Sequence, residues 1–185
     1  MSKITFGMMV SLDGYIEGPA GGPALPEPNE ELHQYFNDLQ KRTALNLYGR
    51  RMYEVMKYWD TADQNLSSPA VEVEYARAWQ STPKAVFSTT LNSVGPNARL
   101  FKEVTPEVLS TLRDEVDGDI EVAGPALAAS LSRLGLIDEY RLYTYPIVLG
   151  GGKPFFAPGT SLKLDFVATE RLPHNVMLLR YQPIR

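Results

Sequence analysis

Cysteine is absent from this 185-residue chain, and histidine occurs only twice, as His33 and His174. Without cysteine the chain has no disulfides, thiolate metal sites, iron–sulfur clusters or cysteine nucleophiles, and nothing in it requires an oxidising compartment. A histidine-based metal site would need carboxylate ligands at a spacing that the sequence does not offer. We therefore predict no metal centre.

Basic clusters and long hydrophobic runs are absent as well. No more than two basic residues stand side by side, and the formal net charge is −4, whereas binding to phosphates by ion release needs a basic face. No window approaches about 18 uninterrupted apolar residues, and the first residues lack the apolar core of a signal peptide. We expect a cytoplasmic protein that binds neither nucleic acid nor membranes.

Three common fingerprints of enzymes are missing too. The chain contains no G-x-G-x-x-G dinucleotide motif, no G-x-x-x-x-G-K phosphate loop and no G-x-S-x-G nucleophile elbow. The run GGGK at residues 150–153 comes nearest to a phosphate loop. It follows a strand-like run without opening a helix, so it is a weak signal.

The sequence does carry the pattern of one ordinary globular α/β domain spanning residues 1–185. Asn29 and Ser68 are placed to cap helices, because their side-chain oxygens can accept from the first free backbone amides. Strand-like runs occupy residues 4–10, 44–48, 84–88 and 119–123, and helical runs about 29–42, 50–56, 68–79, 105–113 and 124–135. Such alternation favours parallel strands joined by right-handed crossovers.

The last third of the chain changes character. Residues 139–146, 162–169 and 175–182 read as strands with no helix between them, which favours antiparallel pairing. The predicted fold is therefore a mixed, mostly parallel central sheet with flanking helices and antiparallel C-terminal strands.

Two turns share one arrangement of strand, glycine and helix start. At Gly49 the glycine is followed by Arg50 and Arg51, and at Gly124 it is followed by Pro125. Glycine lets a ligand approach the backbone, and the first helical turn offers free N–H groups, so the Gly49 turn suits a phosphate. In an open α/β sheet these turns, with residues 11–18 and 88–90, should lie on the one edge that binds ligands. Glycine can equally serve such turns for purely conformational reasons.

Several segments in order resemble the dihydrofolate reductase-like superfamily, and within it the C-terminal reductase domain of bifunctional riboflavin-biosynthesis deaminase-reductases. The resemblance spans nearly the whole chain and depends on order and spacing. The segments are SLDGYI (11–16), YGRRMYE (48–54), FST (87–89), VAGPAL (122–127), GLIDE (135–139) and PIVLGGGKPFF (146–156).

This resemblance implies a sheet of about eight strands that binds NADPH along its carboxyl edge. The residues that would contact the cofactor are Met9, Ile16, Gly49, Arg50, Arg51, Met52, Ser88, Thr89, Gly124, Pro125, Ala126 and Leu127. In the family pattern Met9 and Ile16 meet the nicotinamide, and the two arginines meet the pyrophosphate or the 2′-phosphate. Ser88 and Thr89 would hold the adenosine end.

Departures from the family pattern also matter. Pro125 stands where relatives commonly have a second glycine, and proline removes one donor N–H. The catalytic candidates that the resemblance implies are Asp13 in the loop beside the nicotinamide, and Glu30 or His33, since dihydrofolate reductases carry a carboxylate near the start of the first helix. Several candidate site residues have a structural alternative: Asp13 can cap a turn, Arg50 and Arg51 can be solvated, and Ser88 can be a strand-end hydroxyl.

We therefore expect an NADPH-dependent reductase that delivers hydride to a small heterocyclic or imine substrate. The resemblance also implies a homodimer. The alternative from another class is a non-catalytic NADPH- or nucleotide-binding sensor or interaction protein. The zinc deaminase half of the riboflavin enzymes is missing from this sequence.

Overall fold

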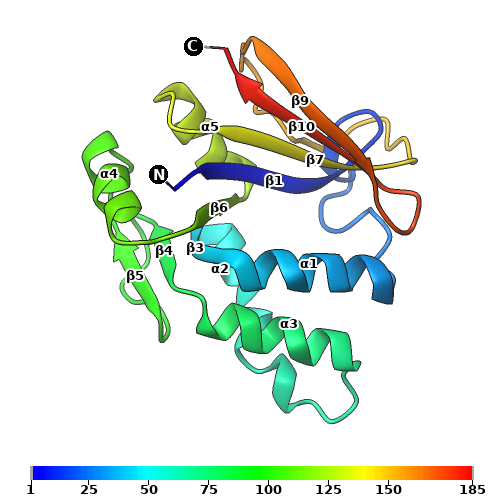
Figure 1. Ribbon diagram of the computed structural model, residues 1–185, viewed down its shortest axis with the longest axis horizontal. Helices are drawn as coiled ribbons and strands as arrows, with labels where there is room; N and C mark the ends of the chain where they lie inside the picture. Colours follow the sequence, from blue (N-terminus) through cyan, green and yellow to red (C-terminus); the bar gives the residue numbers. More distant parts are fainter. Residues whose placement is uncertain (1, 185) are drawn as a thin grey trace.

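Six parallel strands and two antiparallel strands form the main sheet in the computed structural model, which describes residues 2–184 (Figure 1). Their spatial order is β5 (Ala98–Phe101), β4 (Lys84–Phe87), β3 (Thr43–Gly49), β6 (Asp119–Ala123), β1 (Ile4–Ser11), β7 (Glu139–Tyr145), β10 (Met177–Pro183) and β9 (Leu164–Arg171). The first six of these strands pair in parallel, whereas β10 pairs antiparallel with both β7 and β9. The predicted mixed, mostly parallel sheet with antiparallel C-terminal strands is confirmed, and the described residues form a single α/β domain.

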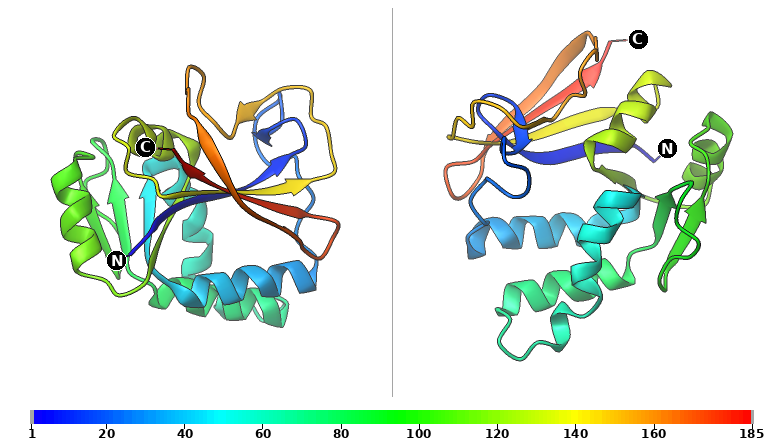
Figure 2. Two further views of the ribbon diagram at one scale, coloured as in Figure 1. Left: turned by 45° about the horizontal axis from the view of Figure 1, so that its top comes forward. Right: turned by 180° about the vertical axis from the view of Figure 1, so that it is seen from behind.

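Helices cover both faces of this sheet (Figures 1 and 2). They are α1 (Glu30–Arg42), α2 (Arg50–Met56), α3 (Ala70–Ser81), α4 (Pro106–Asp114) and α5 (Pro125–Arg133), with the short 3₁₀ helices η1 (Lys57–Asp60) and η2 (Ala62–Gln64). The helices α1 and α3 lie side by side over one face, whereas α4 and α5 contribute their leucines to the core on the other. Within residues 2–184, no helix combines the length and the apolar character needed to cross a membrane.

Alternation along each strand separates the two faces. In β3, Leu45 and Leu47 enter the core beneath α4 and α5. The side chains between them in sequence, Asn46 and Tyr48, face the side of α1 and α3. The face under α4 and α5 is therefore apolar, while the face under α1 and α3 mixes polar and aromatic groups.

Helix caps show where the local sequence rules succeed and fail. Asn29 accepts a hydrogen bond from the Leu32 amide at 3.0 Å, as predicted for the start of α1. The prediction that Ser68 caps α3 is wrong. The helix begins at Ala70 with Pro69 as its N-cap, one residue too far along for the Ser68 hydroxyl, which finds no hydrogen-bond partner among the described residues.

Three short strands are not apparent in the sequence. One is β5; the other two, β2 (Tyr15–Glu17) and β8 (Lys153–Pro154), form a separate two-stranded sheet. This pair joins the loop after β1 to the glycine-rich segment 150–152. It therefore holds Ile16 next to the carboxyl edge of the main sheet.

Candidate functional site

A groove of about 710 Å³ runs along the carboxyl edge of the main sheet. The parallel strands β3 and β6 end there side by side, because Tyr48 pairs in register with Ala123. The glycines that follow, Gly49 and Gly124, are thus neighbours on one edge, as the sequence predicted. Nine of the predicted cofactor residues line the groove: Ile16, Gly49, Arg50, Arg51, Met52, Gly124, Pro125, Ala126 and Leu127.

Gly124 is conformationally required at its turn. Its φ of +96° is a region that side-chain-bearing residues rarely adopt, and an added Cβ would lie 3.1 Å from the Cβ of Met52. Glycine therefore lets α2 and α5 begin close together. Pro125 starts α5 and supplies no N–H, so the remaining free amides of that turn lie further along the helix.

Three cationic side chains line the same groove, together with the carboxylates of Glu17 and Glu54. Arg50 is held by hydrogen bonds from Nε to Glu54 at 2.9 Å and from Nη1 to the Thr90 hydroxyl at 3.0 Å. Arg51 lines the groove beside it and is exposed. Lys153, which the sequence did not mark as a site residue, also lines the groove and donates to Glu17 at 2.9 Å. These cations could bind an anionic ligand.

Ser88 and Thr89 lie at the end of β4 but do not line the groove. The Ser88 hydroxyl is buried and accepts hydrogen bonds from the amides of Thr90 at 3.2 Å and Leu91 at 3.1 Å. Thr89 is exposed. The local geometry therefore matches the structural alternative for Ser88, and adenosine binding by this pair stays a prediction.

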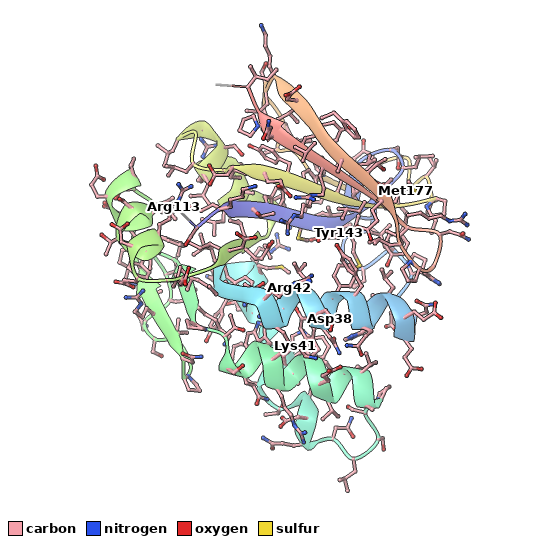
Figure 3. All side chains as sticks on the ribbon, viewed as in Figure 1. Asp38, Lys41, Arg42, Arg113, Tyr143 and Met177 are labelled. Carbon is pink, nitrogen blue, oxygen red and sulfur yellow. The ribbon has the colours of Figure 1, made fainter. Side chains whose placement is uncertain are left out.

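A second cavity, of about 310 Å³, lies between the sheet and the helices α1 and α3. Met8 and Met52 line both this cavity and the groove, so the two spaces meet there. Met9, the remaining predicted cofactor residue, lines the cavity. Figure 3 shows Tyr143 projecting from β7 toward α1, where its ring lies 5.0 Å from that of Phe36.

Aromatic rings form much of the wall of this cavity. Trp59 and Tyr75 both line it, with ring centroids 4.6 Å apart. His33 meets Tyr75 edge-on at 5.6 Å, and its Nδ1 is hydrogen-bonded to Asn37 at 3.0 Å. These walls would accommodate a flat ring.

Of the three catalytic candidates, only His33 lines the cavity. Glu30 is exposed at the start of α1 and lines neither space. Asp13 also lines neither. It accepts hydrogen bonds from the Ser11 hydroxyl at 2.7 Å and from the amides of Leu149 at 3.0 Å and Gly150 at 2.7 Å. These bonds lower the pKa of Asp13 to about 2. They also hold the loop after β1 against residues 149 and 150.

Two polar residues in the cavity were missed at the sequence level. Asn46 on β3 and Glu121 on β6 are paired in register, and both line the cavity. Burial raises the pKa of Glu121 to about 8, although Arg141, whose Nη1 donates to Oε1 of Glu121 at 3.0 Å, opposes the shift. The available signal was a single polar residue inside each apolar strand, in LNLY and in DIEVA.

Behind Glu121, a network of charges crosses the sheet. Arg141 also donates to Glu139 at 2.7 Å, and Glu139 accepts two further hydrogen bonds from Arg180 at 2.8 and 2.9 Å. Glu139 and Arg141 are therefore paired with each other independently of the Glu121 contact. Across residues 2–184, no group of three or more histidine, aspartate or glutamate side chains could hold a metal ion.

Comparisons with known proteins show the family to which the chain belongs. A model of the RibD C-terminal domain family matches residues 2–178. The uncharacterized protein YyaP of Bacillus subtilis (strain 168) is 31% identical over 183 residues, covering 97% of this chain and 94% of that protein.

Two solved structures show the fold. A putative riboflavin biosynthesis protein from Shewanella sp. PV-4 superposes with a TM-score of 0.75 at 24% identity, covering 100% of both chains. Dihydrofolate reductase from Enterococcus faecalis, complexed with NADP(H) and RAB-propyl, superposes with a TM-score of 0.63 at 14% identity, covering 99% of this chain and 97% of that one. The expected dihydrofolate reductase-like fold is confirmed.

Proposed function

Because the chain belongs to the RibD C-terminal domain family, a reductase-type family, we propose that it is an NADPH-dependent reductase that transfers hydride to a small heterocyclic or imine substrate. The bound cofactor would supply the hydride. The protein would bind both partners, orient them and exclude water. The cytoplasmic location expected from the sequence stays a prediction.

One observation carries this proposal: the glycine-lined groove and the aromatic cavity meet at Met8 and Met52. A long ligand lying in the groove could present one end to a small molecule in the cavity. Hydride transfer needs two bound partners in contact within a site that excludes water. The NADP(H) complex of the Enterococcus faecalis enzyme, which has the same fold, adds support.

The residues that line the groove would have different roles in binding the cofactor. Gly49 and Gly124 would allow the cofactor backbone to approach the sheet edge, and Arg50 and Arg51 would bind its phosphates. Ile16, 9% exposed on β2, would cover the ring near the cavity. His33 is the predicted catalytic residue that lies in the substrate space.

We further propose that the protein is a homodimer and that β9 contributes to the contact. Among residues 2–184 this strand has β10 as its only neighbour in the main sheet, and six of its eight residues are exposed. Phe166 and Val167 on it are 58% and 39% exposed, and the register shift opposite Arg180 and Tyr181 leaves Val167 unpaired. Natural proteins rarely leave a long apolar edge strand uncovered.

The direct test is to mix the protein with NADPH and a panel of planar heterocycles and imines, and to follow the absorbance of the reduced cofactor. Substrate-dependent oxidation is expected. Tight binding of NADPH without turnover across the panel would favour the alternative sensor role. Failure to bind NADPH would dismiss both functions.

A double variant tests the phosphate role. Arg50→Ala with Arg51→Ala should weaken NADPH by at least about tenfold and NADH much less, because only NADPH carries the 2′-phosphate. Arg99→Ala is the matched control, since Arg99 is a surface arginine on β5 that pairs with Glu115 and does not line the groove. Equal loss for both cofactors would contradict recognition of the 2′-phosphate.

A further inference from the structure

Asn46 and Glu121 form a polar pair on the floor of an otherwise largely apolar cavity. They lie opposite each other on the neighbouring parallel strands β3 and β6. The residues two positions further along each strand, Tyr48 and Ala123, line the cavity as well. Since side chains alternate along a strand, all four face the same side of the sheet.

Asn46 is buried with an unused donor. It is 3% exposed, and its Nδ2 has no hydrogen-bond partner among the described residues. Burying an amide N–H without an acceptor is costly, so native proteins rarely do so without a reason. The other buried amides nearby are satisfied: Asn37 donates to the Val71 carbonyl and to Glu74, and Gln40, which also lines the cavity, donates to Thr82.

Glu121, which lies next to Asn46, has one carboxyl oxygen that can form a further hydrogen bond. Its Oε1 accepts from Arg141, and within residues 2–184 no hydrogen bond reaches Oε2. The side chain is 14% exposed and lines the cavity. A carboxyl group can accept from a ring N–H or, when protonated, donate to a ring nitrogen, whereas the Asn46 Nδ2 can only donate and so needs an acceptor, for which a carbonyl oxygen is well suited.

We propose that Asn46 and Glu121 together bind a cyclic amide edge, in which a ring nitrogen meets the Glu121 carboxyl and the adjacent carbonyl oxygen accepts from Asn46. The substrate class is thus an uncharged planar heterocycle with a carbonyl next to a ring nitrogen. This inference rests on the proposed reductase function only in treating the ligand as a substrate. The binding site itself is inferred from the residues that line the cavity.

The size, shape and charge of the cavity fit an uncharged planar heterocycle. A volume of about 310 Å³ is near the lower end for ligand pockets, which suits one ring or two fused rings. Trp59 and Tyr75 offer flat walls. Burial raises the pKa of Glu121 to about 8 with Arg141 opposing, so the carboxyl holds its proton more readily than usual. A cationic ligand is therefore not required.

The binding test uses isoquinolin-1-one, which has the cyclic amide edge, against isoquinoline, which lacks the carbonyl, and benzamidine, which is a cation. Trp59 lines the cavity, so its fluorescence should change on binding, whereas the only other tryptophan, Trp79, is buried and does not line the cavity. We expect isoquinolin-1-one to bind at least about tenfold more tightly than either control compound. Equal binding of isoquinoline, or tighter binding of benzamidine, would overturn the proposal.

Variants assign the preference to the two residues. Asn46→Leu and Glu121→Met should each remove it, whereas Glu121→Gln should keep most of it, because an amide can still donate and accept. Asn46→Leu should also keep or raise the midpoint of thermal unfolding, since it removes an unsatisfied donor, while Asn37→Leu should lower it by several degrees. An intact preference in Asn46→Leu, or a loss of stability matching that of Asn37→Leu, would refute the assignment.

All of these titrations are made without NADPH, which separates the two proposals. The protein could show a cyclic amide preference that depends on Asn46 and yet neither bind nor oxidise NADPH. That result would refute the reductase function and support this binding site. NADPH oxidation in a protein without that preference would do the reverse.

Discussion

Replacing Gly152 with alanine should separate β2 from β8 and open the wall of the groove that Ile16 lines. A Cβ at Gly152 would lie 2.0 Å from the carbonyl oxygen of Glu17, and the φ of +123° is rarely adopted by any other residue type. Because an ordinary carbon–oxygen contact is about 3.3 Å, one of the two chains would have to move by roughly 1.3 Å.

The cost follows from two effects. Backbone strain at such a φ costs about 1–3 kcal/mol, and forcing atoms into occupied space costs a further 1–3 kcal/mol or so. The small sheet pairs only Tyr15 with Pro154 and Glu17 with Lys153. We therefore expect it to detach before the main sheet unfolds, so the variant should fold with a modestly lower thermal midpoint and a clearly weaker affinity for NADPH.

Gly150→Ala is the matched control. Gly150 also has a positive φ, of +73°, but nothing lies within 4 Å of an added Cβ. This variant should show only the strain of about 1–2 kcal/mol from the left-handed backbone and should keep its NADPH affinity. Thermal unfolding and an NADPH titration of both variants decide the matter. Equal behaviour of the two would refute the claim that contact with Glu17 positions the groove wall.

Two further predictions concern charge and assembly. Burial alone would raise the pKa of Glu139, but hydrogen bonds from Arg180 and Arg141 outweigh it and lower the pKa to about 2. A carboxyl group with a lowered pKa stabilises the fold at neutral pH, and this stabilisation is lost as the pH falls from about 4.5 to 2. Glu139→Gln should therefore remove about 3 kcal/mol of the acid dependence of the unfolding free energy, measured by urea unfolding at a series of pH values. An unchanged acid dependence would contradict this prediction. Phe166→Glu should shift the proposed dimer toward monomer in sedimentation without lowering the thermal midpoint of the monomer, and an unchanged sedimentation profile would exclude β9 from the contact.

The long elements of the fold were predictable, and the short ones were not. Asn29 marks the start of α1 because an asparagine oxygen there can accept the free Leu32 amide. The strand β8 has only two residues, and its pairing with β2 depends on a chain segment far away in sequence. No local pattern carries that information. Ser68 misled because serine before proline resembles a cap, although the helix starts beyond its reach.

Some parts of the candidate site could be predicted from the sequence, and others could not. Gly49 and Gly124 could be predicted to meet, because parallel strands bring their carboxyl ends to one edge. The place of Asp13 beside the cofactor stays a prediction. Its partners are the Ser11 hydroxyl and two amides of the glycine-rich loop, 136 and 137 residues away. Asn46 and Glu121 were missed since each is a single polar residue in an apolar strand. Only the register between β3 and β6 makes them a pair.

The strand β6 connects the two halves of the site. It carries Glu121 on the cavity floor and leads to Gly124 at the groove, with β3 on one side and β1 on the other. At about 3.3 Å per residue, these two positions lie roughly 10 Å apart along a rigid strand. In the proposed reductase, the distance between the residue that anchors the substrate and the turn that anchors the cofactor would thus be set by the covalent spacing of a central strand. Changes at Asn46 or Glu121 should then alter which ligand enters the cavity while leaving the groove intact.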